Sequence, residues 1–248
     1  MKIFKEIFGR IWALWALVSF MTTMFIVVLP ICCTYLIDEP KGTEIFRRIS
    51  NAWMRVWLTM IACPMRIVGK ENFRKGEVYV VTCNHSSLMD IPLSTPFIPG
   101  ANKTIAKNSF AKVPFFGWIY ARGSVLVDRK SDASRRKSLD DMKKTIQQGL
   151  HMVIYPEGTR NRSNEPLKAF YDGAFKLAVD VQRSVIPTVI FNTKKVMPAN
   201  KFFYIMPHKL EMHFLSEISS AGKTVSELKE EVRERMYDYI VVKRMNDN

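Results

Sequence analysis

The feature that most constrains the fold of this chain is a long stretch without any charged residue, from position 11 to position 37. A helix rises about 1.5 Å per residue, so a stretch of this length crosses a hydrocarbon core of roughly 30 Å with some tilt. The run is longer than the apolar region of a secretory signal peptide, and it shows no small-residue cleavage site. The sequence therefore predicts a retained membrane helix, kinked near Pro30.

A second apolar segment, residues 51–69, is interrupted by Arg55 and Arg66. Its aromatic residues and charges are typical of a helix that lies at the membrane interface, although a core helix of the soluble part has a similar composition. Basic residues flank the first helix on both sides, so the positive-inside rule assigns no orientation. We expect residues 1–69 to anchor the protein and residues 70–248 to form a separate domain.

The charge of the chain indicates an anionic partner. Lysine and arginine outnumber aspartate and glutamate by 37 to 23, which gives a net charge of +14. Such an excess is typical of proteins that bind nucleic acid or an anionic lipid surface. Only the lipid surface also accounts for the apolar stretch, so we expect membrane lipids as partners and no nucleic acid. The cysteines form neither a CxxC pair nor a zinc-ligand spacing, so we expect reduced thiols and no metal.

From about residue 70 onward, short apolar runs alternate with amphipathic segments. Most of the runs are continuous rather than alternating, as in strands that are covered on both faces. Two segments have helical spacing: residues 131–150, and a C-terminal segment that opens with a capping box at Thr224 and Glu227. The sequence predicts an α/β domain. Its expected strands are residues 77–82, 103–106, 124–128, 151–155 and 185–191.

A histidine and an aspartate follow directly on the first of these strands, in the stretch VVTCNHSSLMD at residues 80–90. His85 and Asp90 are five positions apart, which does not place them on one face of a helix. The spacing fits a histidine in the turn and an aspartate on the following helix, with Ser86 or Ser87 as its cap. Asp90 would then bind one ring nitrogen and leave the other to act as a base. A structural histidine in a loop has the same pattern.

A polar turn, PEGTR, follows the strand at residues 151–155. Gly158 allows close backbone approach to a ligand, and Arg160 offers a fork that suits phosphate or carboxylate. Lys107 and Arg129 follow two other strands, so in a parallel sheet all these residues meet at one edge. Residues 114–118, PFFGW, fit either ordinary core or the apolar wall of an acyl-chain site.

Together these residues resemble the glycerolipid acyltransferases, specifically the 1-acyl-sn-glycerol-3-phosphate acyltransferase family. The resemblance covers roughly residues 65–215 and rests on four blocks in the same order. The blocks are Asn84-His85 with Asp90, Gly123 to Arg129, Pro156 to Arg160, and Val185 to Pro187. The chain departs from the family at Tyr171 and Asp172, where basic residues are common, and at Asn161, where serine is common.

The resemblance implies a mostly parallel sheet flanked by helices, preceded by a membrane helix and an interfacial helix. It also implies an O-acyltransferase of phospholipid biosynthesis that moves an acyl group from acyl-CoA or acyl carrier protein to the sn-2 hydroxyl of 1-acyl-sn-glycerol-3-phosphate, giving phosphatidic acid. His85 would be the base and Asp90 its orienting partner, with backbone amides near Gly158 stabilising the oxyanion. The implied substrate-binding residues are Asn84, Lys107, Arg129, Glu157, Gly158, Thr159 and Arg160.

The same resemblance implies that the enzyme needs no cofactor. It also implies that the protein lies in an inner or cytoplasmic membrane, with its catalytic domain in the cytoplasm, where thioester donors are made. Three alternative hypotheses stay open at this point. The first is a different lysolipid as acceptor, and the second is a non-catalytic lipid-binding protein on the same fold. The third is covalent transfer through Cys83.

Overall fold

The computed structural model of the protein describes residues 2–128 and 132–246, and within them a seven-stranded sheet with the order β1-β7-β6-β2-β5-β3-β4. Every neighbouring pair is parallel except β6 and β7, which are antiparallel. This is the mostly parallel α/β sheet that the sequence predicted. The strands are β1 (Met65–Val68), β2 (Val80–Cys83), β3 (Asn102–Lys107), β4 (Ser124–Val127), β5 (His151–Ile154), β6 (Val185–Phe191) and β7 (Leu210–Phe214).

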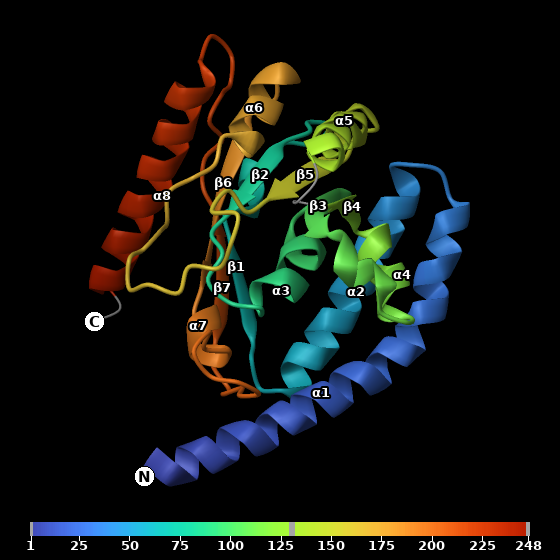
Figure 1. Cartoon of the computed structure of the whole chain (residues 1–248), viewed down its shortest axis with the longest axis vertical. Helices are drawn as coiled ribbons and strands as arrows, with labels where there is room; N and C mark the ends of the chain where they lie inside the picture. Colours follow the sequence, from blue (N-terminus) through green and yellow to red (C-terminus); the bar gives the residue numbers. More distant parts are fainter. Residues whose placement is uncertain (1, 129–131, 247–248) are drawn as a thin grey trace.

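Helices cover both faces of the sheet (Figure 1). The α-helices are α1 (Lys2–Cys33), α2 (Lys41–Met60), α3 (Asp90–Phe97), α4 (Phe116–Arg122), α5 (Asp132–Gln147), α6 (Gly173–Asp180), α7 (Thr193–Val196) and α8 (Val225–Asn246). Short 3-10 turns are η1 (Thr34–Leu36), η2 (Lys70–Asn72) and η3 (Asn108–Lys112). One apolar core joins the sheet to α1, α2 and α3, and a second joins it to α5, α6 and α8. Successive residues of a strand point to opposite faces of the sheet, which is why both faces are apolar. In β2, Val81 packs in the first core and Val80 in the second.

The five expected strands are all present, with ends shifted by at most three residues. The capping box is also confirmed, because Thr224 Oγ1 accepts the amide of Glu227 at 3.3 Å while Glu227 Oε2 accepts the amide of Thr224 at 2.8 Å. Two strands were missed. β7 returns antiparallel beside β6, and β1 pairs with β7 at the edge of the sheet.

The position of β1 changes the interpretation of residues 51–69. The helix in this region begins at Lys41 and ends at Met60, and residues 65–68 belong to the sheet. Trp53 and Trp57, which we expected at the membrane interface, are buried in the core, as in the core-helix alternative. We keep the division into an anchoring region and an acyltransferase domain as a proposal, with β1 counted in the domain.

The long helix α1 is the candidate membrane span by length and composition, and it continues through Pro30. It packs lengthwise beside α2 (Figure 1) and is tied to it by indole N–H groups. Trp57 donates to the Ala16 carbonyl at 3.0 Å and Trp12 to the Ile61 carbonyl at 3.0 Å. The opposite face exposes large apolar side chains such as Ile11, Leu14 and Val18. A long exposed apolar face of this kind favours contact with lipid.

A buried ion cluster joins the turn between α1 and α2 to α4. Arg122 is 5% exposed and donates to Glu39 at 2.7 Å, and Lys103 lies 3.1 Å from the same carboxylate. Thr43 donates to Glu39 through both its hydroxyl and its amide. Burial by itself would raise the pKa of Glu39, but the hydrogen bonds from Arg122 and Thr43 and the charge of Lys103 outweigh it and lower the pKa to about 2.

We expect Glu39→Gln to lower the thermal unfolding midpoint at pH 7, since Arg122 then keeps its charge in a buried place without a carboxylate. A carboxyl whose pKa is lowered on folding stabilises the fold fully above its ordinary value of about 4.5 and loses that contribution as the pH falls toward about 2. The difference between wild type and variant should therefore shrink from pH 5 to pH 3 in detergent. The matched control is Asp38→Asn, at the exposed neighbouring carboxylate. A difference that stays constant over this range would contradict the assignment.

Candidate active site

His85 lies in the loop between β2 and α3, where its ring is held by one carboxylate. His85 Nδ1 lies 2.8 Å from Asp90 Oδ2, and the Tyr155 ring packs against the imidazole with 4.5 Å between ring centroids. Asp90 is fully buried, whereas the side chain of His85 is 14% exposed. An ionised carboxylate only accepts hydrogen bonds, so Nδ1 carries the proton and Nε2 has the free electron pair. The pair has the arrangement of a base with an orienting partner.

Asp90 also organises the backbone of the loop. The amides of Ser86 and Ser87 donate to the same Oδ2 at 2.6 and 2.7 Å. Asp90 is the first residue of α3, and the cap position before it is Met89, which makes no side-chain capping bond. The prediction that Ser86 or Ser87 caps this helix was therefore wrong. The Ser87 hydroxyl accepts the amide of Met89 at 3.2 Å, one residue before the helix, and the two serine amides donate to the aspartate and fix the carboxylate beside His85.

Two residues that we expected to bind substrate, Asn84 and Glu157, hold the loop in place. Asn84 is buried, and its side-chain amide exchanges two hydrogen bonds with the backbone of Ile190 on β6, at 2.7 and 3.0 Å. Glu157 is 1% exposed and accepts the amides of His85 at 2.7 Å and Lys168 at 3.0 Å. Burial raises the pKa of Glu157, while the two amides act in the opposite direction. Neither residue lines the cavity beside His85.

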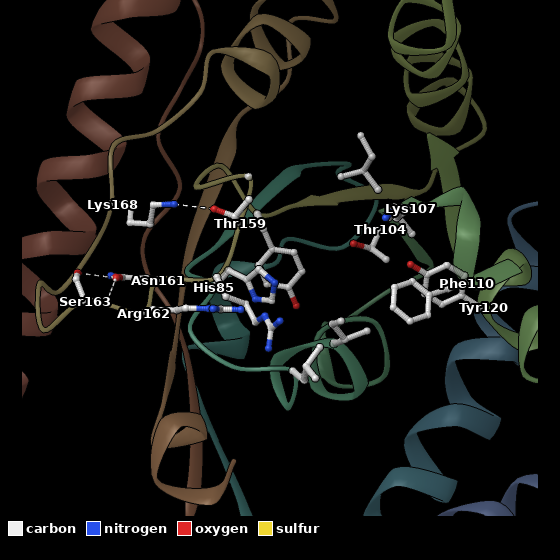
Figure 2. Close-up of a pocket in the computed structure, with 17 residues that line it drawn as sticks. His85, Thr104, Lys107, Phe110, Tyr120, Thr159, Asn161, Arg162, Ser163 and Lys168 are labelled. Atoms are coloured by element: carbon white, nitrogen blue, oxygen red, sulfur yellow. Dashed lines mark hydrogen bonds between the residues drawn. The ribbon is translucent and has the colours of Figure 1, made fainter. Parts of the chain in front are cut away.

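That cavity has a volume of about 810 Å³ and lies at the carboxyl ends of β2, β3 and β5 (Figure 2). Figure 2 shows His85 and Thr159 on one side and Lys107, Phe110 and Tyr120 on the other. Gly158 and Arg160, predicted from the PEGTR turn, also line it. The sheet edge therefore gathers residues from positions 85 to 168 into one crevice, as parallel topology requires.

The positive charge of the cavity comes from more residues than the sequence indicated. Arg160 and Arg162 both line it, and among the described residues neither forms an ion pair. Lys168 lines it too and donates to Thr159 Oγ1 at 2.6 Å. Arg162 stands only two positions after Arg160 in the same loop, which is the signal that could have identified it. Arg129, predicted to add charge here, lies outside the described residues.

The turn at residues 156–160 has a shape that only glycine fits at its centre. Gly158 has a φ of +66°, and a Cβ placed there would meet the ring of Tyr171 at 2.8 Å. The amide of Gly158 donates to the Tyr155 carbonyl and that of Thr159 to the Glu157 carbonyl. These two amides already donate within the turn, and the assignment of oxyanion donors to backbone amides near Gly158 stays a prediction.

Cys83 has none of the properties of an acyl-accepting nucleophile. It is fully buried on β2 and does not line the cavity. Burial, together with the nearby Asp90 charge, raises the pKa of its thiol, so that the reactive thiolate is disfavoured. The geometry therefore favours direct transfer over the covalent alternative. Among the described residues, no three His, Cys, Asp or Glu side chains are grouped to hold a metal ion.

A second cavity, of about 280 Å³, adjoins the first. Leu88, Ile91, Thr104 and Tyr120 line both cavities, and the inner walls of the second come from α2, α3 and α4. Its lining includes Trp53, Phe116 and Ile119, and no charged side chain among the described residues. Phe116 belongs to the PFFGW segment, so this part of the segment forms an apolar wall beside the catalytic cavity.

Comparison with known proteins places this site in a family. A sequence model of the family described as Acyltransferase matches residues 64–191. A 1-acyl-sn-glycerol-3-phosphate acyltransferase of Saccharomyces cerevisiae is 30% identical over 86% of this chain and 70% of its own length. A protein of the same name from Borreliella burgdorferi is 28% identical over 64% of this chain and 66% of its own length.

The fold has a close counterpart among solved structures. The crystal structure of the 1-acyl-sn-glycerophosphate acyltransferase PlsC from Thermotoga maritima superposes with a TM-score of 0.84 and covers 97% of this chain and 98% of its own. Its sequence is only 21% identical, so it supports the fold alone. Several curated relatives are longer than this chain, which spans 59% of the one from Chlamydomonas reinhardtii. The family model and the yeast relative together show that the chain belongs to the 1-acyl-sn-glycerol-3-phosphate acyltransferase family and is an O-acyltransferase.

Proposed function

We propose that the protein transfers an acyl group from acyl-CoA or acyl carrier protein to the sn-2 hydroxyl of 1-acyl-sn-glycerol-3-phosphate, giving phosphatidic acid. One observation carries this proposal: a carboxylate-held histidine lines a cavity with two arginines that form no ion pair among the described residues. This cavity adjoins an apolar cavity that no described charged side chain lines. A base, an anion site and an acyl-chain site are the parts that this reaction needs. The names of the relatives agree with it.

In the proposed mechanism, His85 Nε2 takes the proton of the sn-2 hydroxyl as its oxygen attacks the thioester carbonyl carbon. Asp90 holds the ring and stabilises the imidazolium that forms, without taking the proton itself. The tetrahedral intermediate then collapses, the carbon–sulfur bond breaks, and His85 returns the proton to the departing thiolate. The products are an ester and a thiol, and no other reactant is required.

The donor's acyl chain fits the smaller apolar cavity. That chain begins at the reacting carbonyl carbon, so its site must start beside His85, and Leu88 and Tyr120 join the two cavities there. The walls of this smaller cavity include aromatic rings of α1, α2 and α4 and no charged side chain among the described residues. Burial of apolar surface would supply the affinity, at about 25 cal/mol per Å².

We assign the acceptor phosphate to Arg160, with Lys107 and Arg162 adding positive charge at the same cavity. Arg160→Lys keeps the charge but loses the bidentate fork, so the KM for the lysolipid should rise about tenfold while the KM for the thioester changes little. Steady-state kinetics with each substrate varied in turn would measure this. Arg233→Lys is the matched control, at a partly exposed position of α8 that lines neither cavity. A rise confined to the thioester KM would place Arg160 on the donor side.

We also propose that α1 anchors the enzyme in the membrane with its catalytic domain in the cytoplasm, where thioester donors are made. A cysteine introduced at the exposed Asn164, together with Cys32→Ser and Cys33→Ser, reports the side of the membrane near the cavity, since Cys63 and Cys83 are buried. An impermeant maleimide should label it in opened cells but not in intact ones. Labelling in intact cells would reverse the proposed orientation.

The decisive experiment measures acyl transfer by purified membranes. Each of a panel of lysolipid acceptors is combined with an acyl-CoA donor and, separately, with an acyl carrier protein donor. The proposal expects 1-acylglycerol 3-phosphate to be the best acceptor, with phosphatidic acid as the product. A stronger reaction with a different lysolipid would move the acceptor assignment. Binding of lysolipid without any transfer would favour a non-catalytic lipid-binding protein instead.

A further inference from the structure

A third cavity, of about 640 Å³, lies between α1 and the loop that follows α7. One wall is the α1 face with Ala13, Ala16 and Leu17, and the other is the loop from Met197 to Ile205. The small side chains of Ala13 and Ala16 leave room that larger ones would fill. The volume lies within the range of roughly 300–1,000 Å³ that is typical of small-molecule sites. The donor-chain assignment above does not use this cavity, and the phosphate assignment uses only the two arginines that it shares with the cavity of His85.

The cavity is a built feature, because several contacts fix the loop to the helix. The amide of Ile205 donates to the Gly9 carbonyl at 3.1 Å, and the Tyr204 ring lies so close that a Cβ at position 9 would meet it at 2.2 Å. Lys201 forms an ion pair with Glu6 and lies 4.1 Å from the centre of the Tyr204 ring. The loop therefore approaches α1 at Gly9 and leaves the space beside Ala13 and Ala16 open.

The third cavity shares several lining side chains with the other two. Leu88, next to Ser87 in the loop of His85, lines all three, and Phe20 lines both the second and the third. Arg160 and Arg162 line the catalytic cavity and the third cavity but not the second. Two further cavities thus adjoin the cavity of His85. They share Phe20 and Leu88 with each other, and of the two only the third is lined by Arg160 and Arg162.

The chemistry of the two substrates distinguishes these spaces. The donor's chain begins at the reacting carbonyl itself and carries no charge, which suits the second cavity. In the acceptor, the chain at sn-1 and the phosphate at sn-3 are attached to the carbons on either side of the reacting hydroxyl. The site of the acceptor's chain must therefore begin beside cations and close to the base. The third cavity is lined by Arg160 and Arg162, and it shares these two arginines and Leu88 with the cavity of His85.

We propose that the third cavity binds the acyl chain already present on the acceptor, and that Phe20 and Leu88 keep it apart from the chain being transferred. This inference rests on the proposed function. It makes Ala13, Ala16 and Ala199 determinants of the acceptor's chain length and leaves the donor's chain length to the second cavity. The exposed Phe202 and half-exposed Phe203 belong to the same lining, so the cavity opens beside the apolar surface of α1.

A crossed specificity experiment tests the proposal. Ala199→Trp, at a partly exposed loop position, fills the third cavity, and Ala13→Leu fills it from α1. Ser50→Leu fills the second cavity, where the buried Ser50 hydroxyl has no partner among the described residues and loses no hydrogen bond. Ala221→Trp, on the exposed loop before α8, is the matched control. For each variant, kcat/KM is measured with octanoyl and palmitoyl acceptors and, separately, with lauroyl and palmitoyl donors.

Filling the third cavity should lower the ratio of kcat/KM for palmitoyl over octanoyl acceptors at least about tenfold, because losing the burial of one methylene changes affinity about fourfold. The donor ratio should stay within about twofold, and Ser50→Leu should show the opposite pattern. If Ala13→Leu does not fold, Ala199→Trp decides. An unchanged acceptor ratio, a changed donor ratio, or equal loss with both acceptors in folded Ala199→Trp would overturn the proposal. If the wild-type protein acylates none of these acceptors, the proposed function itself has failed.

Discussion

Replacing His85 with alanine is expected to lower kcat about 10²–10⁴-fold, the usual contribution of a positioned general base. The hydroxyl then has no proton acceptor at the end of β2, and the imidazole held by Asp90 is absent from the cavity. KM for either substrate should change much less, because in the proposed mechanism His85 contacts the reacting hydroxyl rather than the phosphate or the chains. The measurement is steady-state acyl transfer with a lysolipid acceptor, together with an unfolding curve in detergent.

The matched control is His208→Ala, since His208 lies in the segment before β7 and does not line any of the three cavities. It should keep wild-type kinetics. Cys83→Ser should also remain active, because the thiol is buried away from the cavity. Near-native turnover of His85→Ala would end the proposed mechanism. An acyl group found on Cys83 by mass spectrometry would restore the covalent alternative.

Asp90→Asn is expected to lower kcat about as much as the loss of His85 does, by up to roughly 10⁴-fold. The same change has this effect in hydrolase triads. If the amide oxygen takes the place of Oδ2, it still accepts the Ser86 and Ser87 amides, but its NH₂ group occupies the buried Oδ1 position, which has no partner among the described residues. If the side chain is flipped, its NH₂ faces two amide donors and the imidazole. In both orientations the negative charge that stabilises the imidazolium is lost.

The test compares kcat and the unfolding midpoint of Asp90→Asn with those of wild type. A positioning role predicts that kcat falls far more than KM and that Asp90→Glu restores little activity, because a longer side chain cannot occupy the same buried place. Asp38→Asn serves as the control for removing a carboxylate. A variant that unfolds more readily than wild type but keeps full kcat would show that Asp90 is structural only.

The sequence by itself determined the elements whose signals are local. The continuous apolar runs identified five strands, because a strand buried on both faces needs apolar residues at successive positions. The capping box identified the start of α8, and the His85–Asp90 spacing placed one residue in a turn and the other on a helix. The PEGTR turn was identified by its glycine and arginine. Each of these features is decided by residues that are neighbours in the chain.

Only the tertiary structure decided what depends on residues that are distant in the chain. β1 and β7 are strands because they pair with each other at one side of the sheet, and residues 65–68 alone gave no sign of it. Asn84 and Glu157 have the polar character of ligands for substrate, but their partners are backbone groups 106 and 72 positions away. The cavity between α1 and the 197–205 loop depends on the contact of Tyr204 with Gly9, which holds the loop on the helix. No local sequence pattern predicts that contact. Spatial proximity, not residue type, separates the groups that bind substrate from those that hold the fold.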